Sequence, residues 1–207
     1  MSVTVAAFDV DNTLTVRDCV VPFMRSVSGT GHTLKVLLSG LGETIQSIRR
    51  RDRDALKEKF VAGIFSGRDA DQIEQLGIQF ASRVADSWLR EDVSARMRWH
   101  QEQGHVVILV SASLGVYLHP LGDLLEVDAV LCTEMEEVDG VLTGKLVGRN
   151  CRGEEKASRV QNWCQDSGVS VDDLVYAYGD SSGDKQLLEL FRHGTWVNSV
   201  DLVESAG

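Results

Sequence analysis

The sequence predicts an α/β fold in which helices cover both faces of a mainly parallel sheet. Short apolar runs rich in β-branched residues alternate with helical patterns along the chain, which is typical of a parallel, doubly wound sheet. The stretch between the first two apolar runs shows only helical patterns, which indicates an inserted unit. We therefore expect a Rossmann-like core formed by residues 1–16 and 89–207 and a helical cap formed by residues 17–88.

The composition favours one globular unit with an ordinary core. Of the 207 residues, 43% are hydrophobic and 25% are charged, so the chain can bury a core without disulfides or structural metals. The net charge of −10 disfavours nucleic acid and anionic membranes as partners, because binding to either depends on positive charge. No apolar run approaches the ~18 residues of a membrane-spanning helix. We expect no nucleic-acid or membrane partner, and either a monomer or a homodimer.

The cysteines and the N-terminus point to a reducing compartment. The chain has Cys19, Cys132, Cys151 and Cys164, with no CxxC pair and no zinc-finger spacing to a histidine. Reduced, mostly buried thiols are their ordinary interpretation. The N-terminus has no basic segment and meets an acid at Asp9, which is unlike a signal peptide. We therefore expect a cytoplasmic protein.

The first half of the chain has one strand signal followed by helical patterns. Residues 3–8 form a β-branched apolar run, which is typical of a buried strand. The pattern from 17 to 103 is helical, and Asp69 stands where a helix N-cap would lie. After it, apolar residues at helical spacing form one face of a helix: Ile73, Leu76, Phe80, Val84 and Trp88.

The second half alternates strand and helix signals. Gly104 ends the preceding helix, and the strands expected after it lie at 105–110, 128–132, 174–178 and 195–197. Helical patterns occupy 114–125, 153–167 and 182–191. Two further strands, at 134–138 and 141–147, flank Asp139-Gly140, which is a strong hairpin signal.

Polar residues directly follow three of the expected strands. Asp9 and Asp11 follow the first strand, Ser111 follows the second, and Asp180 and Asp184 follow a later one. Ligands of open α/β sheets bind outside the carboxyl ends of the strands. Four carboxylates gathered there would repel one another unless a cation neutralised them, and oxygen ligands of this kind suit Mg²⁺. Taken singly, each acid could instead form a turn or cap a helix.

These motifs resemble those of the haloacid dehalogenase superfamily of phosphohydrolases. That family has Asp-x-Asp-x-Thr after a first strand, a serine or threonine ending a second, an isolated lysine, and Gly-Asp followed by another acid. The resemblance spans residues 3–197, and the helical insertion is similar to the C1-type cap of the phosphoserine phosphatase-like branch (subfamily IB). The matching residues are Asp9-Val10-Asp11-Asn12-Thr13, Ser111, Lys156, Gly179-Asp180 and Asp184.

The resemblance implies a Mg²⁺-dependent phosphatase that acts on a small phosphorylated metabolite, a phosphate ester. It makes Asp9 the nucleophile, which forms an aspartyl-phosphate and divides the reaction into two easier steps. It makes Asp11 the general acid toward the leaving oxygen and then the general base toward water. The second Asp also favours phosphate esters over haloacids as substrates, because true dehalogenases of the superfamily lack it.

The resemblance also assigns the metal and phosphate ligands. Asp9, the backbone carbonyl of Asp11 and Asp180 would hold Mg²⁺, with Asp184 supporting the site. Phosphoryl oxygens would be bound by three further groups: the side chains of Ser111 and Lys156 and the backbone N–H of Ala112.

Three alternatives remain open at this level. Phosphoserine phosphatase proper is one, because Asp18 lies nine residues after the nucleophile, where that family has an acid. Against it, Ser111-Ala112-Ser113 replaces the usual Ser-Gly-Gly, and Gly183 replaces the usual asparagine. The second is a non-catalytic phosphate-binding or scaffold protein on the same fold. The third is transfer of the phosphoryl group to an acceptor other than water.

Two features of the insertion have competing interpretations. Asp18 is expected to contact the non-phosphate end of the substrate, because the insertion leaves the sheet directly after the first motif; a capping or surface aspartate is the alternative. A basic run at 49–53 either steers an anionic substrate or forms a solvated helix junction.

Overall fold

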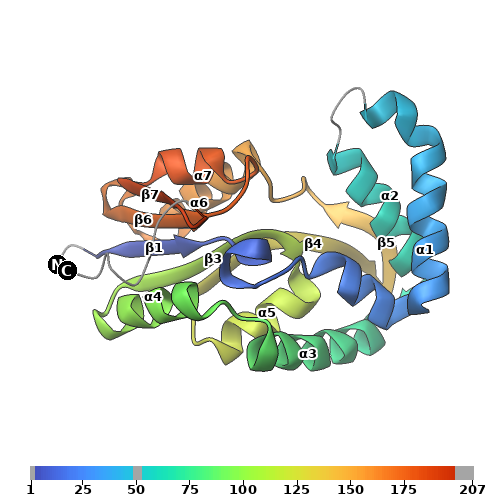
Figure 1. Cartoon of the computed structure of the whole chain (residues 1–207), viewed down its shortest axis with the longest axis horizontal. Helices are drawn as coiled ribbons and strands as arrows, with labels where there is room; N and C mark the ends of the chain where they lie inside the picture. Colours follow the sequence, from blue (N-terminus) through green and yellow to red (C-terminus); the bar gives the residue numbers. More distant parts are fainter. Residues whose placement is uncertain (1–2, 49–52, 199–207) are drawn as a thin grey trace.

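The computed structural model describes residues 3–48 and 53–198, with side chains described from 3 to 38 and from 54 to 198. Within these residues a seven-stranded sheet has the order β2-β5-β4-β3-β1-β6-β7 and carries helices on both faces (Figure 1). The strands are β1 (Val5–Phe8), β2 (Arg68–Asp69), β3 (Val106–Leu114), β4 (Ala129–Val138), β5 (Val141–Val147), β6 (Leu174–Gly179) and β7 (His193–Trp196). The predicted doubly wound α/β fold is confirmed.

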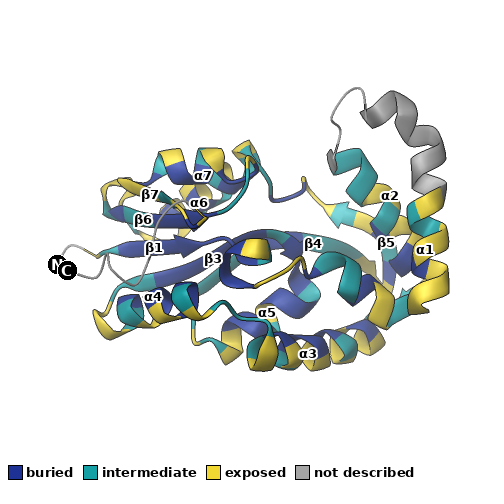
Figure 2. Ribbon diagram, in the orientation of Figure 1, coloured by how far each residue is buried: buried dark blue, intermediate teal, exposed yellow. Residues whose placement is uncertain are grey.

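The helices form one layer on each side of the sheet. On one side α6 and α7 cover the strands, and on the other α4 and α5 do so, with α3 packed along α5 (Figure 1). The helices are α1 (Val20–Ile48), α2 (Arg53–Phe65), α3 (Ala70–Ser87), α4 (Glu91–Glu102), α5 (Gly115–Leu124), α6 (Glu154–Ser167) and α7 (Lys185–Leu190). Buried residues line both faces of the sheet and the inner faces of the helices (Figure 2).

Strand β1 is an interior strand, which lies between β3 and β6 and pairs with both in parallel. All four of its residues are buried, as expected for a parallel strand covered on both faces. Its last residue, Phe8, is aligned with Leu109 of β3 and Tyr178 of β6. The register therefore brings the residues that follow these three strands to one edge of the sheet.

Two strands are longer than the sequence predicts. The strands expected at 128–132 and 134–138 form the single strand β4, whose first half pairs with β3 and whose second half pairs with β5. No glycine or proline separates these halves, so the extended backbone continues. Strand β3 likewise runs past Val110 to Leu114, with a register shift in this interval.

The described part of the insertion contains one strand, which corrects the expectation of a purely helical segment. Strand β2 has only two residues, too few for periodicity to reveal, and pairs antiparallel with β5. The expected N-cap is confirmed, because the Asp69 side chain accepts a hydrogen bond from the N–H of Gln72 at 2.9 Å. The predicted apolar face of α3 is buried at Ile73, Phe80 and Val84. The division into a core and a cap of residues 17–88 stays a prediction.

The cysteines agree with the expectation of buried thiols. All four cysteines are free and buried. Among the described residues, no helix combines the length and the apolar character that crossing a membrane would require.

The contact between α3 and α5 generates a stability prediction. A Cβ on Gly77 of α3 would lie 2.1 Å from the carbonyl oxygen of Val116 in α5. We expect Gly77→Ala to lower Tm, because overpacking costs about 1–3 kcal/mol and outweighs the ~1 kcal/mol gained in helix propensity. Thermal unfolding monitored by circular dichroism measures the change.

Gly31→Ala is the matched control, because it is also a helical glycine and no described heavy atom lies within 4 Å of its added Cβ. This variant should raise Tm slightly. Equal increases for both variants would show that α3 does not lie against α5 as described.

Candidate active site

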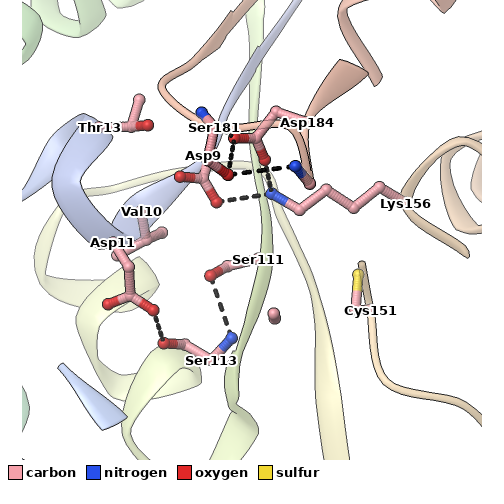
Figure 3. Close-up of polar contacts among 12 residues, drawn as sticks. Asp9, Val10, Asp11, Thr13, Ser111, Ser113, Cys151, Lys156, Ser181 and Asp184 are labelled. Carbon is pink, nitrogen blue, oxygen red and sulfur yellow. Dashed lines mark hydrogen bonds and ion pairs between the residues drawn. The ribbon is translucent and has the colours of Figure 1, made fainter. Parts of the chain in front are cut away.

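The predicted strand-end residues meet at one edge of the sheet. Asp9 directly follows β1, Ser111 lies in the last part of β3, and Asp180 directly follows β6. Figure 3 shows the Ser111 hydroxyl between the Asp9 carboxylate and Ser113. The chain after Asp9 makes a tight turn from Val10 to Leu14 in which Asn12 has a φ of 60°, a conformation that asparagine tolerates better than most residues.

Lys156 reaches this edge from the first turn of α6. Its ammonium Nζ lies 2.6 Å from an oxygen of Asp9 and 2.6 Å from an oxygen of Asp184 (Figure 3), and its side chain is buried. Just before α6, the N–H of Gly153 donates to the carbonyl of Gly183 at 2.9 Å. The loop that carries Asp184 is therefore tied to the start of the helix that carries the lysine.

Burial and the neighbouring charges together determine the pKa values of Asp9 and Lys156. Burial raises the pKa of Asp9 to about 7, against the lowering effect of Lys156, and the charge of Asp184 adds to the increase. Burial alone would lower the pKa of Lys156, but the two carboxylates outweigh it and hold that pKa above its ordinary value. Lys156 therefore stays charged, while the carboxylates are incompletely neutralised.

Asp184 fixes the loop after β6. Its second carboxylate oxygen accepts from the N–H of Ser181 at 2.9 Å, from the Ser181 hydroxyl at 3.0 Å and from the N–H of Asp180 at 3.3 Å. A Cβ on Gly179 would lie 2.6 Å from the Cβ of Asp184, so glycine is required there. The supporting role predicted for Asp184 is consistent with these contacts, which hold Asp180 at the edge of the site.

The donor set fits a hard divalent cation. Asp9, Asp180 and Asp184 each offer a carboxylate oxygen, and the three oxygens lie within 4.8 Å of one another. Among the described residues, Lys156 is the cation that forms ion pairs with this group. Burial and the charge of Asp184 also raise the pKa of Asp180. Three acids against one lysine leave a negative site of oxygen donors, which suits Mg²⁺.

Asp11 is held apart from this cluster by its own hydrogen bonds. One carboxylate oxygen accepts from the N–H of Cys19 at 2.8 Å, and the other accepts from the Ser113 hydroxyl at 2.5 Å (Figure 3). The hydroxyl of Tyr117 in turn donates to Ser113 at 2.7 Å. Burial, followed by the charge of Asp18, raises the pKa of Asp11. An oriented carboxyl group with a raised pKa is suited to donate a proton.

Lys57 is a contributor that the sequence analysis missed. It lies on α2 of the insertion, and its ammonium donates to the backbone carbonyl of Ala112 and, at 3.0 Å, to the side-chain oxygen of Asn150. The amide nitrogen of Asn150 donates to Asp54, also on α2, at 2.7 Å. Burial lowers the pKa of Lys57 to about 8. These contacts join α2 to the core beside Ser111; no sequence motif marks Lys57.

Asp18 lies two residues before α1 and is exposed. Its carboxylate accepts a hydrogen bond from the N–H of Val21 at 3.1 Å, which is a helix-capping contact. The same carboxylate is close enough to Asp11 to raise its pKa. The capping contact is therefore present, and a role in contacting substrate stays a prediction. The side chains of the basic run at 49–53 lie outside the described residues.

Comparisons with known proteins agree with the motifs. Residues 6–189 match the family model described as haloacid dehalogenase-like hydrolase. Protein CicA of Caulobacter vibrioides is 34% identical over 185 residues, which cover 89% of this chain and 81% of CicA. Phosphoserine phosphatase SerB1 of Mycobacterium tuberculosis is 27% identical over 199 residues, which cover 93% of this chain and 64% of SerB1.

Solved structures share the fold. A protein of unknown function from Bordetella pertussis Tohama I superposes with a TM-score of 0.73 at 24% identity, covering 91% of this chain and 87% of that one. A structure of a phospho-aspartyl intermediate analogue of phosphoserine phosphatase gives a TM-score of 0.64 at 16% identity, covering 93% and 85%. At these identities the likeness concerns the fold alone.

The raised pKa of Asp9 predicts how the metal-free protein responds to pH. Between its ordinary value of 3.8 and the folded value of about 7, the folded state binds more protons at Asp9 than the unfolded state. The free energy of unfolding should therefore fall as pH rises through this range. Asp9→Asn should make the fall shallower and raise Tm near pH 7, where about 1 kcal/mol corresponds to ~2–4 °C.

The measurement is Tm against pH in EDTA, with Asp86→Asn, a change at an exposed position on α3, as a control for the loss of one charge. If all three proteins gave parallel curves, Asp9 would not have the raised pKa.

Proposed function

Because the chain belongs to the haloacid dehalogenase-like hydrolase family, we propose that this phosphatase is Mg²⁺-dependent and hydrolyses a small phosphomonoester through an aspartyl-phosphate on Asp9. The observation that carries the proposal is the buried Lys156 ammonium between Asp9 and Asp184, 2.6 Å from each. These ion pairs hold the Asp9 carboxylate at the edge of the sheet, beside the positive charge of Lys156, which can bind phosphate. Asp180 adds the further oxygen donors that a metal needs.

The proposed metal ligands are Asp9, Asp180 and the backbone carbonyl of Asp11, with Asp184 supporting the site through the loop contacts. When bound there, Mg²⁺ would supply positive charge that offsets the negative charge of the phosphoryl oxygens. The protein's own contribution is to keep these acids together at a buried edge, which Lys156 makes possible by neutralising part of their charge.

In the first step, an oxygen of Asp9 attacks phosphorus while the bond from phosphorus to the ester oxygen breaks. Lys156 and the Ser111 hydroxyl bind the phosphoryl oxygens, whose charge is redistributed in the transition state. Asp11 gives its proton to the departing oxygen, so the product leaves as an alcohol. The hydrogen bonds from Ser113 and from the N–H of Cys19 keep the Asp11 carboxyl oriented for this transfer.

In the second step, water attacks the phosphorus of the aspartyl-phosphate and Asp11 accepts its proton, which restores Asp9 and releases phosphate. Tyr117 and Ser113 form a hydrogen-bonded chain that ends on Asp11. Such support for an acid–base group favours an enzyme over a phosphate-binding or scaffold protein, because binding alone needs no proton transfer. An acceptor other than water would use the same residues, and product analysis distinguishes it.

The proposed substrate is a small cytoplasmic metabolite. Four free, buried cysteines support a reducing compartment. Phosphoserine is a second candidate substrate, because phosphoserine phosphatase SerB1 is among the relatives. Gly183, in place of the usual asparagine, is one departure from that family. In this chain Arg152 occupies the space that a side chain at position 183 would need, because its Nε lies 3.0 Å from a Cβ added there.

The nucleophile assignment predicts a loss of turnover. With a generic aryl phosphate and Mg²⁺, we expect Asp9→Asn to lower kcat/KM at least about 100-fold, because a neutral amide is a poor nucleophile. EDTA should abolish the wild-type activity and added Mg²⁺ should restore it. Asp86→Asn should behave as wild type. Full activity of the wild type in EDTA would refute the metal requirement. More than a hundredth of the wild-type activity in Asp9→Asn would refute Asp9 as the nucleophile.

The contacts of Asp18 allow a sharper test than replacing its side chain with that of alanine. Asp18→Asn keeps a side-chain oxygen to cap α1 but removes the charge, so the fold should be unaffected. We expect the ranking of phosphate esters to change, with cationic substrates losing most, while a generic aryl phosphate is still turned over. Because the Asp18 charge raises the pKa of Asp11, the alkaline limb of the pH profile should also move to lower pH.

The measurement is kcat/KM for several esters as a function of pH. A proportional change on every ester would show that Asp18 does not contact the substrate. If the alkaline limb of the pH profile did not move, the charge of Asp18 would not affect the pKa of Asp11.

A further inference from the structure

A second cluster of potential metal ligands lies outside the phosphatase site. His119 comes from α5, and Cys132 and Glu134 come from β4. The His119 Nε2 lies 2.8 Å from a carboxylate oxygen of Glu134, the Cys132 sulfur lies 3.0 Å from the same oxygen, and the sulfur and the imidazole nitrogen are 3.7 Å apart. One nitrogen, one sulfur and one oxygen thus converge on a common point.

The fold brings these three groups together and leaves room for them. Cys132 and Glu134 are two residues apart on a strand, so both side chains lie on the face toward α5. A Cβ on Gly115, the first residue of α5, would lie 2.1 Å from a carboxylate oxygen of Glu134. The missing side chain of Gly115 therefore creates the space that the Glu134 carboxylate occupies. Sequence spacing did not reveal the cluster, because His119 and Cys132 meet only through the packing of α5 on the sheet.

We propose that His119, Cys132 and Glu134 form a binding site for a borderline divalent cation such as Zn²⁺. Zinc binds imidazole, thiolate and carboxylate, whereas Mg²⁺ takes oxygen ligands, so the two sites differ in metal preference. Ligand atoms around tetrahedral zinc lie roughly 3.3–3.7 Å apart, as follows from its bond lengths. The sulfur–nitrogen distance already matches, and the other two must open by roughly half an ångström. Movement of the exposed His119 side chain can open the nitrogen–oxygen distance, and rotation of the partly exposed Glu134 carboxylate can open the sulfur–oxygen distance.

The surroundings supply access and charge balance. His119 and Glu134 line a cavity of about 290 Å³, and Cys132 and Glu134 line a neighbouring one of about 400 Å³. Solvent can therefore reach the cluster and complete the coordination with water. Binding releases the thiol proton to solvent, and the resulting thiolate and the Glu134 carboxylate then balance the two charges of the cation. Arg159 donates to the backbone carbonyl of Cys132. This contact holds the strand and leaves the Cys132 sulfur available to a metal.

The test uses Co²⁺ as a spectroscopic probe of the full chain, with Mg²⁺ in excess to occupy the all-oxygen site. Because only coordination by a thiolate gives a sulfur-to-cobalt charge-transfer band in the near ultraviolet, the band separates this cluster from the phosphatase site. We expect the band to saturate at one Co²⁺ per chain and to disappear when Zn²⁺ is added. Cys132→Ser should lack the band, while Cys164→Ser, which removes a buried thiol from α6, should retain it.

His119→Gln provides a second variant, because this exposed side chain can be changed without disturbing the core. Zn²⁺ titration calorimetry should show affinity weakened by more than about 10-fold, since loss of even an outer-shell partner costs roughly 10–100-fold. Absence of the band in the wild type, its persistence in Cys132→Ser, or unchanged Zn²⁺ affinity in His119→Gln would overturn the proposal. The cluster would then be a hydrogen-bonded contact between α5 and β4.

Discussion

The ion pairs of the buried Lys156 ammonium with Asp9 and Asp184 are the contacts on which the site depends. They join the end of β1, the start of α6 and the loop before α7, three segments far apart in the chain. Removing Lys156 would be costly, because it would leave two buried carboxylates without a compensating charge, whereas without Asp9 the lysine still pairs with Asp184. Lys156 is therefore required for the acids to share one edge, whichever substrate the protein uses.

The same arrangement links stability to chemistry. One lysine cannot neutralise three neighbouring carboxylates, and burial raises the pKa of Asp9 to about 7 in the metal-free protein. The carboxylates thus destabilise the site, a common property of functional sites, and the proposed cation would relieve their repulsion. Around this centre, hydrogen bonds hold each group in its place: Ser181 donates to Asp184, and Ser113 to Asp11. Lys57 then ties α2 of the insertion to the core beside these groups.

Local signals account for what the sequence could predict. The buried run of β1 and the polar residue directly after it identify both a buried strand and Asp9, because a parallel strand is apolar along its whole length. The two-residue β2 and the uninterrupted β4 escaped prediction, since strand pairing and burial depend on distant segments. For the same reason Lys57 and the His119–Cys132–Glu134 cluster could not be foreseen: their groups meet only after helices pack on the sheet, and no spacing records that packing.

The central claim is that Asp9 carries the phosphoryl group at a cation site built from this carboxylate cluster. The most direct test is a crystal structure of the protein with Mg²⁺ and beryllofluoride, a mimic of the phosphoryl group. We expect beryllium bonded to a carboxylate oxygen of Asp9, fluorines facing Lys156 and Ser111, and the cation between Asp9 and Asp180. Beryllofluoride attached to another side chain, or a cation bound away from Asp9 and Asp180, would contradict it.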